Sequence, residues 1–456
     1  MTKAPTVSEI LADWIVEMDL ANVPNDAIAG CANTIIDTIG LSVAALDTDY
    51  GQSVRQAFDD RGTATVFGIG QGFAPESAAA INGTCGHGED YDNTFEGCPV
   101  HSGVVIVPAL MAAGQRYNLP AAAVAKGIVV GIEVMCRLGL VADKYVHKAG
   151  FHPTGILGAM AAAAGVGAAM GQTRAQLRDT MGVAGSTASG IIEYLADGSS
   201  TKRLHPGWAA QAGMRAAALG AAGFSGPSTV FEGVHGLFHG FANSKPDFTP
   251  LISDLGGMWQ SGRLAFKPFA CGTMTQPYVD CAIALKRRGV TPDQITAITC
   301  EVGEGTVHRL WAPLALKQNP PTAYAAKFSG PYCVAAGLVF GDAGLAEFTD
   351  TALANPALRA LCPKIDFVVD PDNPYPSNYT GHVKATLTDG QVVEARAACL
   401  RGGAQEPLSR DDILAKCAAN LTFAGRNGAG AQRLAEFADA LMAGHGGFAP
   451  EAVDLA

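Results

Sequence analysis

The stretch GILGAMAAAAGVGAAMG, residues 155–171, consists almost entirely of alanine and glycine, with a few larger apolar side chains. Residues 207–223 have the same character. Side chains this small let two helix backbones approach closely, so both segments are predicted to be central helices that pack against each other. The first run is also shorter than the ~20 residues that a transmembrane helix needs, and we expect no membrane span.

Helical patterns extend outward from these two segments, from residue 7 to about residue 245. Pro24 and Asn25 are typical of a helix start and precede apolar residues at helical spacing. Thr173 and Gln176 have the spacing of a capping box. Near the carboxyl end, Ser409 is the expected N-cap of a further helix. The first half and the tail of the chain are therefore predicted to be helical.

The pattern changes after about residue 257. Residues 293–302 resemble a strand, and residues 382–397 form a hairpin candidate with Asp389-Gly390 as its turn. Helical patterns lie between them at 274–288 and 322–340. We predict a mostly α protein: a large all-helical domain built from residues 1–256 and 405–456, with a smaller α/β lid domain, residues 257–404, inserted into it.

Composition narrows the class of protein. Of 456 residues, 48% are hydrophobic and 16% are charged, which is typical of a large globular protein rather than a disordered one. The net charge of −11 argues against a nucleic-acid binder, and no basic run suggests a membrane surface. The amino terminus lacks the apolar stretch of a signal peptide. The eleven cysteines are scattered without a CxxC pair, which is typical of buried thiols in a reducing cytoplasm.

One short segment concentrates titratable groups. The stretch GHGEDYDNTFEGCPVHSG, residues 86–103, places four carboxylates between His87 and His101, and Asp90, Thr94 and His101 are its candidate site residues. Three interpretations fit this composition: a metal site, a proton-transfer site and a solvated acidic loop. The ligand spacing matches no metal motif.

Four other islands carry chemistry, and each also has an ordinary structural explanation. His152 precedes a Pro-Thr helix start, where it could act as a catalyst or as a capping residue. Lys202, Arg203 and His205 precede a Pro-Gly pair taken as another helix start, and they form either an anion pocket or a solvated basic turn. Lys267 lies between apolar neighbours, where it could be a desolvated base or a lysine whose ammonium group snorkels to solvent. Tyr332 belongs to a group of tyrosines, where it could be a proton donor or a core residue.

No cofactor motif accompanies these islands. The sequence has no P-loop, no G-x-S-x-G elbow and no dinucleotide fingerprint. Acids, imidazoles, lysines and tyrosines without such a motif favour proton transfer on an anionic substrate.

Taken together and in order, the islands resemble a known family. GHGEDYDNT…HSG, GFHPTG, KRLHPGWAAQAG, FKPFACGTMTQPYVDCA and AKFSGPYCVAAGL are similar to segments of the MmgE/PrpD family, over about residues 7–425. Its members include 2-methylcitrate dehydratase, cis-aconitate decarboxylase and iminodisuccinate epimerase. The resemblance implies a helical domain with an α/β lid, a basic cleft between them, a homodimer, and no metal, iron–sulfur cluster or nucleotide.

The resemblance also implies site residues. Its active-site pattern falls on Asp90, Thr94, His101, His152, Lys202, Lys267 and Tyr332. We expect Asp90, His101 or His152 to move the proton, with Tyr332 donating or orienting. We expect three residues to bind substrate: Thr94, Arg203 and His205. We expect the cationic side chains to bind the substrate carboxylates and to stabilise the negative charge that develops in the reaction. These are Lys202, Arg203, His205 and Lys267.

The sequence departs from the family pattern at several positions. Asn93 stands where an acid is common, and Ser102 stands where proline is usual. Gly272, Met274 and Gln276 occupy positions where dehydratase-like members carry an arginine or histidine, which favours a substrate with fewer carboxylates.

Several activities therefore stay open. The simplest prediction is a 2-methylcitrate-dehydratase-like lyase acting on a small di- or tricarboxylate. The alternatives are an epimerase of an imino- or amino-dicarboxylate such as iminodisuccinate, a cis-aconitate-type decarboxylase, and a catalytically silent homologue that binds carboxylates.

Overall fold

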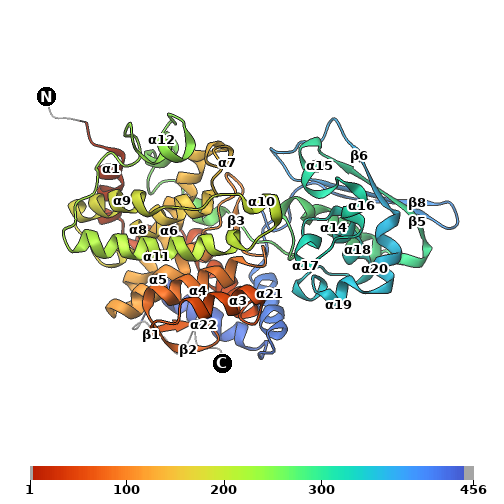
Figure 1. The fold of residues 1–456 in the computed structure, drawn as a ribbon, viewed down its shortest axis with the longest axis horizontal. Helices are drawn as coiled ribbons and strands as arrows, with labels where there is room; N and C mark the ends of the chain where they lie inside the picture. The colour runs from red at the N-terminus through yellow and green to blue at the C-terminus, as the bar shows by residue number, and fades with distance from the viewer. Residues whose placement is uncertain (1–3, 446–456) are drawn as a thin grey trace. The chain divides into compact units, whose positions relative to one another are not determined.

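A computed structural model describes residues 4–445 and divides the chain into two compact units (Figure 1). Of the described residues, the first unit contains 4–88, 92–265 and 413–445, and the second contains 89–91 and 266–412. Residues 89–91 therefore leave the first unit for three positions and then return. The prediction of a mostly α fold is confirmed.

The first unit is built around α8 (Pro153–Ala169), every residue of which is buried. A helix that is apolar all round belongs in a protein core. It packs against α6 (Ala121–Ala142) and α11 (Thr201–Ala221), and α11 packs in turn against α4 (Pro75–His87). The prediction of two central, mutually packed helices is confirmed for α8 and α11. The remaining helices of this unit are α1 (Val7–Glu17), α2 (Asn25–Ala44), α3 (Asp49–Ala57), α5 (Gly103–Tyr117), α7 (Tyr145–Lys148), α9 (Arg174–Thr187), α10 (Tyr194–Asp197), α12 (Leu237–Ala242), α13 (Thr249–Ile252), α21 (Arg410–Phe423, which begins in the second unit) and α22 (Gly430–Met442).

The close approach of these helices requires small residues at the points of contact. A Cβ atom added at Gly213 would lie 2.4 Å from Ala162 Cβ and 2.7 Å from the backbone nitrogen of Ala163. A Cβ atom at Gly165 would lie 2.6 Å from the carbonyl oxygen of Gly127 in α6. Both contacts are shorter than a van der Waals contact, so glycine is required on each side of α8.

The first unit is not all-helical, which corrects the prediction. Strands β1 (Arg61–Val66) and β2 (Gly70–Phe73) pair antiparallel, and β3 (Thr94–Phe95) pairs antiparallel with β4 (Leu264–Ala265). The sequence between residues 61 and 73 carries β-branched residues and several glycines, which are typical of a hairpin. The β3–β4 pair joins segments about 170 residues apart, so no local pattern announces it.

Helix α2 passes the length and composition test for a membrane span, but 78% of its apolar window is buried inside the structure. A core helix of a folded protein passes the same test. No other helix among residues 4–445 does so.

The second unit contains a four-stranded sheet in the order β6-β5-β7-β8. Strands β5 (Ile295–Val302) and β6 (Ile365–Val369) are parallel, whereas β7 (Gly381–Leu387) is antiparallel to both β5 and β8 (Val392–Ala397). Helix α14 (Gln276–Arg287) packs on β7 and β8, and α18 (Gly330–Val339) packs on α14. The other helices are α15 (Glu304–Leu310), α16 (Leu314–Gln318), α17 (Ala323–Ala326), α19 (Asp350–Leu353) and α20 (Pro356–Leu361).

Most of the local predictions are confirmed. The predicted hairpin forms between β7 and β8, and Gly390 has a φ of +87°, which the turn requires and which glycine adopts without strain. The Thr173–Gln176 capping box is present, and Ser409 Oγ accepts a hydrogen bond from the Asp412 N–H. The proposed role of this unit as a lid stays a prediction.

We expect Gly213→Ala to destabilise the protein, because the added methyl group meets backbone atoms of α8. Overpacking typically costs about 1–3 kcal/mol, which exceeds the roughly 1 kcal/mol that alanine gains over glycine in a helix. Urea denaturation measures the change. Gly240→Ala in α12 is the matched control, since nothing lies within 4 Å of its added Cβ atom. Equal stability of the two variants would contradict the close-packing argument.

Candidate functional site

The acidic stretch folds as a turn between two helices. Helix α4 ends at His87, and α5 begins at Gly103. Between them Asp90 adopts a left-handed backbone conformation, with a φ of +55°. Asp tolerates this conformation better than most residues, and such strained positions often occur at functional sites. The turn places residues 89–91 in the second unit and keeps His87 and Asp92 in the first.

Asp92 is the centre of the cluster in the first unit. Its carboxylate is fully buried, and its Oδ2 lies 2.9 Å from His87 Nδ1 and 3.1 Å from His101 Nδ1. Burial alone would raise the pKa of Asp92, but the imidazoles of His101 and His87 outweigh burial and hold this pKa well below its ordinary value. Asp92 is therefore ionised at neutral pH.

These contacts fix the tautomer of His101. Its Nδ1 lies 3.1 Å from the Asn93 carbonyl oxygen as well as 3.1 Å from the Asp92 carboxylate. Both partners only accept hydrogen bonds, so Nδ1 must carry the proton. In the neutral ring Nε2 is then left without a hydrogen, and it is available as a base. A buried carboxylate behind an imidazole also stabilises that imidazole once it gains a proton.

His87 is held by the same carboxylate but is hard to protonate. Burial lowers its pKa to about 4, although Asp92 acts in the opposite direction. At neutral pH His87 is an uncharged ring that donates from Nδ1 to Asp92. Its Nε2 is buried without a hydrogen-bond partner among the described residues.

His152 and His205 form a second imidazole pair in the same unit. His152 occupies the N-cap position of α8, as its sequence predicts, although its side chain makes no capping hydrogen bond. Its Nδ1 lies 3.1 Å from His205 Nδ1 on α11. Burial lowers the pKa of His205 to about 4 and that of His152 well below its ordinary value, and neighbouring imidazoles and Lys202 lower both further.

The four imidazoles form a continuous row. Ring centroids are separated by 4.8 Å between His101 and His87, 5.7 Å between His87 and His152, and 5.2 Å between His152 and His205. Lys202 is close enough to lower the pKa of His87, His152 and His205. Repulsion among these groups disfavours positive charge on the row, and a bound anion would relieve that repulsion.

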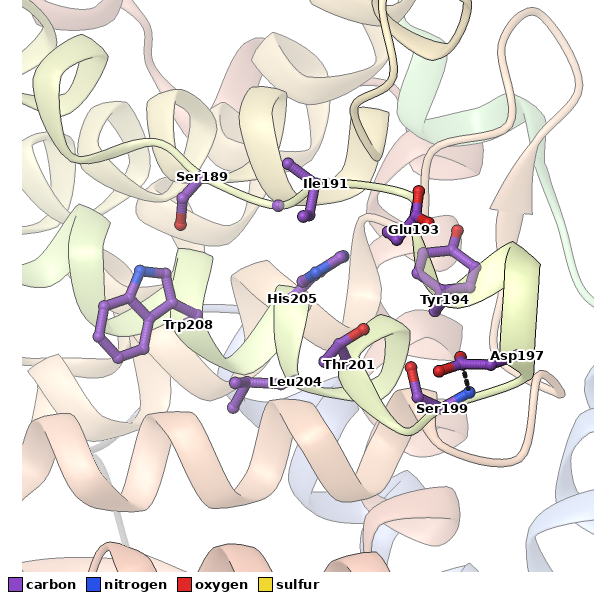
Figure 2. A pocket seen from close by; sticks show the side chains of 11 residues that line it. Ser189, Ile191, Glu193, Tyr194, Asp197, Ser199, Thr201, Leu204, His205 and Trp208 are labelled. Carbon is purple, nitrogen blue, oxygen red and sulfur yellow. Dashed lines mark hydrogen bonds between the residues drawn. The ribbon is translucent and has the colours of Figure 1, made fainter.

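A cavity of about 600 Å³ opens beside this row, at α10 and the start of α11. Figure 2 shows His205 and Tyr194 lining the cavity, together with Trp208. Tyr194 lies 6.2 Å from His152 and 6.0 Å from His205, measured between ring centroids. The carboxylates of Glu193 and Asp197 also border the cavity, so its outer part is unfavourable for an anion.

A hydrogen-bonded frame holds the residues around Asp92. Asp37 Oδ2 accepts a hydrogen bond of 3.0 Å from the Asn93 N–H, and its Oδ1 lies 2.7 Å from Lys416 Nζ. Asn93 Oδ1 accepts from the Gly103 N–H at 3.2 Å, and Asn93 Nδ2 contacts Ser102 Oγ at 3.5 Å. Asn93 and Ser102, which both depart from the family pattern, are thus neighbours. The Asn93 side-chain amide supplies the N–H donor to Ser102 that an ionised acid at this position would lack.

One prediction about the basic island is wrong. Lys202, Arg203 and His205 do not precede a helix, because α11 begins at Thr201 and contains Pro206 in its interior. The Pro-Gly pair was taken as the start, but proline is tolerated near the beginning of a helix as well as at its first position. The three residues occupy the first two turns of α11.

The side chains of the basic residues at the start of α11 make different contacts. Arg203 donates to the Gly88 carbonyl at 3.1 Å and to Ser200 Oγ at 2.9 Å, and its guanidinium stacks over the Tyr50 ring at 4.6 Å. Thr94, another predicted binding residue, is buried and its Oγ1 lies 3.4 Å from the Val100 carbonyl oxygen. The structure joins His101, His152, His205 and Lys202 in one cluster. The substrate-binding roles expected of Arg203 and Thr94 stay predictions.

Asp90, Lys267 and Tyr332 lie in the second unit. Lys267 Nζ donates to the Asp90 carbonyl at 2.7 Å and lies 3.5 Å from its Oδ2. Tyr332 donates to the Glu347 carbonyl at 2.7 Å. The site roles implied for these three residues stay predictions.

Lys327 and Gln276 are two further polar residues of the second unit with buried side chains. Lys327 Nζ lies 2.8 Å from Glu89 Oε2, beside the turn that carries Asp90. Gln276, which stands at a cation position of the family, is buried, and its side chain bonds the backbone of Phe269 and Cys271.

The residue types at Asp92 also invite a metal. One ligand atom each from His87, Asp92 and His101 lie within 4.8 Å of one another. A metal held by Asp92 together with both Nδ1 atoms would displace the two protons that these rings donate to Asp92. The observed contacts of Nδ1 are those of hydrogen bonds to a carboxylate, which is the arrangement of a proton-transfer site.

Sequence reasoning missed His87 and Asp92 as site residues. Both lie in the acidic stretch, five positions apart, and only the end of α4 and the following turn bring them to the same point. The signal was the presence of a second acid and a second histidine in that stretch, but the sequence offered no way to choose between Asp90 and Asp92.

Comparison with known proteins agrees with this geometry. The MmgE/PrpD N-terminal domain profile matches residues 9–249, and the MmgE/PrpD C-terminal domain profile matches residues 269–440. The chain belongs to the MmgE/PrpD family. The resemblance predicted from the sequence is thereby confirmed.

Curated relatives cover nearly the whole chain. Cis-aconitate decarboxylase of Mus musculus is 27% identical, with 91% of this chain and 86% of the relative covered. The Homo sapiens cis-aconitate decarboxylase is 26% identical, covering 91% and 88%. A cis-aconitate decarboxylase-like protein, oryM, of Aspergillus oryzae is also 26% identical, covering 91% and 90%.

We expect the free energy of unfolding to fall as the pH decreases from about 6.5 to 4. His87 and His205 have folded-state pKa values of about 4, so the unfolded chain, where histidine titrates near 6.5, binds more protons in this range. Each imidazole contributes at most about 3 kcal/mol to the decrease. Urea unfolding at several pH values measures it. His87→Gln should flatten the pH dependence, and the exposed His239→Gln should not. An unchanged slope in His87→Gln would contradict the assignment.

Proposed function

We propose that this member of the MmgE/PrpD family is a lyase that transfers a proton at the carbon next to a carboxylate of a small di- or tricarboxylate. The hydrogen bond from His101 Nδ1 to the buried, ionised Asp92 supports this assignment most directly. It leaves His101 Nε2 as a base and stabilises the imidazolium that forms.

The surroundings of His101 suit an anionic substrate. Lys202 is partly buried and supplies a positive charge close to the row of buried imidazoles, where a charge acts more strongly than it would in water. Loss of a proton next to a carboxylate places negative charge on the substrate, so a nearby cation favours the transition state over the ground state.

The relatives narrow the reaction. The named activity of the two mammalian relatives is decarboxylation of cis-aconitate. In a decarboxylation the bond to CO2 breaks, its electron pair stays on the substrate, and a proton is delivered to carbon. In a dehydration a base removes the proton from carbon, and hydroxide leaves with a proton from an acid. Both reactions use the groups found here, and we propose cis-aconitate-type tricarboxylates as the first substrates to test.

Several finer assignments belong to this proposal. A dehydratase acting on 2-methylcitrate and an epimerase of an imino-dicarboxylate use the same proton-transfer step. The homodimer and the cytoplasmic location predicted from the sequence stay predictions, as do the roles of Asp90, Lys267 and Tyr332.

Proton NMR in D2O with a panel of carboxylic acids tests the proposal. The panel contains cis-aconitate, citrate, 2-methylcitrate, malate and both isomers of an amino-dicarboxylate. An alkene product from a hydroxy acid indicates dehydration, and itaconate from cis-aconitate indicates decarboxylation. Deuterium entering a substrate without a new product indicates epimerisation, which would replace the lyase assignment. No reaction with any member would leave carboxylate binding without catalysis and would contradict the proposal.

We expect His101→Gln to lower kcat by at least about a hundredfold, because glutamine cannot act as a general base. Initial rates on the substrate found in the panel measure the loss. The exposed His239→Gln is the control and should retain the wild-type rate. A His101→Gln enzyme with wild-type kcat would assign the base to another residue.

Asp92→Asn should lower the rate of proton transfer. The neutral amide no longer stabilises the imidazolium that forms on His101 in the reaction, and it weakens the choice of tautomer, so we expect kcat to fall by at least about tenfold. Circular dichroism checks the fold. A folded Asp92→Asn enzyme with the wild-type kcat would contradict this role of Asp92.

A further inference from the structure

The contact between His152 and His205 has an unusual consequence for protons. Their Nδ1 atoms are 3.1 Å apart, so exactly one hydrogen lies between them. The ring that donates this hydrogen has a bare Nε2, and the ring that accepts it carries its own hydrogen on Nε2. In the neutral state the pair therefore presents one donor and one acceptor on its outer nitrogens.

A single added proton changes this arrangement without breaking the contact. The proton binds the bare Nε2, and the Nδ1–H···Nδ1 bridge stays in place. The pair then presents two N–H donors and one positive charge. Each of these outer N–H groups suits an acceptor such as a carboxylate oxygen, which accepts hydrogen bonds only.

Burial, together with the groups around the pair, explains why it is neutral without a ligand. His87 stacks on His152, and His101 and Lys202 also lie close enough to disfavour a positive charge there. Tyr194 lies against both rings. The nearby carboxylate of Asp92 is already bonded to His87 and His101, while Glu193 and Asp197 border the outer cavity. Among the described residues no carboxylate forms an ion pair with either ring of the pair.

We propose that an anionic ligand bound at this cluster draws one proton onto the His152–His205 pair, so that dicarboxylate binding is coupled to proton uptake. A negative charge beside an imidazole favours its protonated form, which reverses the effect of Lys202 and the neighbouring rings. The buried His87 Nε2, without a hydrogen-bond partner among the described residues, is a further polar atom that such a ligand would satisfy. His205 borders the cavity, which gives protons a route from solvent.

This coupling rests on the proposed function for the class of ligand, and it deepens that function. His101 acts as the base, whereas the His152–His205 pair stores the acid proton. In a dehydration that proton leaves with hydroxide as water, and the proton taken from carbon returns to solvent from His101. In a decarboxylation the electron pair released with CO2 is taken up by the stored proton at the carbon next to a remaining carboxylate, and one proton is consumed in each turnover.

Isothermal titration calorimetry with succinate and tricarballylate tests the coupling without any turnover. Titrations at pH 7.5 in HEPES and in Tris, whose ionisation enthalpies differ, give the number of protons taken up. We expect about one proton for each ligand bound, and an affinity that weakens about tenfold per pH unit above neutrality. His205→Gln, which keeps a hydrogen-bonding group beside His152 but does not titrate, should lose most of the uptake.

The controls separate the possible results. His239→Gln, an exposed histidine outside the cluster, should retain full uptake. Wild-type binding without buffer dependence, full uptake in a folded His205→Gln, or no binding of either acid would each overturn the proposal.

A second measurement covers the case in which His205→Gln does not fold. Nitrogen-15 NMR of histidine rings in the wild type should show the loss of one bare-nitrogen signal when succinate is added, and its retention would overturn the proposal. Turnover without proton uptake would overturn the coupling and leave the lyase assignment standing. Proton uptake without turnover would support the coupling and contradict the lyase assignment.

Discussion

A fully buried carboxylate can stay ionised only if its neighbours supply the hydrogen bonds that water would have supplied. At Asp92 two imidazole N–H groups do so for Oδ2, at 2.9 and 3.1 Å, while Oδ1 has no hydrogen-bond partner among the described residues. This requirement orients both rings, sets the tautomer of His101 and leaves one of its nitrogens free for chemistry. The rest of the first unit can be understood as the frame that keeps these three side chains in place.

The frame has two layers. The nearer layer is polar: Asp37, paired with Lys416, holds the backbone of Asn93, and Asn93 in turn meets Gly103 and Ser102. Burial raises the pKa of Asp37, although Lys416 opposes that change. A buried ion pair of this kind contributes little net stability, and its value here is in specifying one geometry. The outer layer is the group of small-residue helices around α8, which brings the starts of α8 and α11 close enough for His152 and His205 to touch.

The cluster separates two kinds of proton site that share one residue type. His101 donates from Nδ1 to a buried carboxylate. His152 and His205 contact each other instead, and burial, neighbouring imidazoles and Lys202 disfavour their charged forms. Different surroundings for one residue type are how one site can supply both a base and an acid. The lysines of the second unit act on the same stretch of chain, because Lys267 and Lys327 bind the turn at residues 89–91.

The sequence by itself determined the class of fold, most of the local elements and the family. Periodicity and caps located α2, α9, α14 and the β7–β8 hairpin because those signals depend on residues within one or two turns. It also identified His101, His152, Lys202 and His205 as residues of interest. The tertiary structure alone decided that Asp92 contacts His101, that His152 bridges to His205, and that Arg203 serves Tyr50 and Gly88. The pairings of His152 and of Arg203 join segments far apart in the chain, whereas Asp92 and His101 meet within one turn. They depend on the direction in which each side chain points from a helix end or a turn, and a local sequence pattern does not determine that direction.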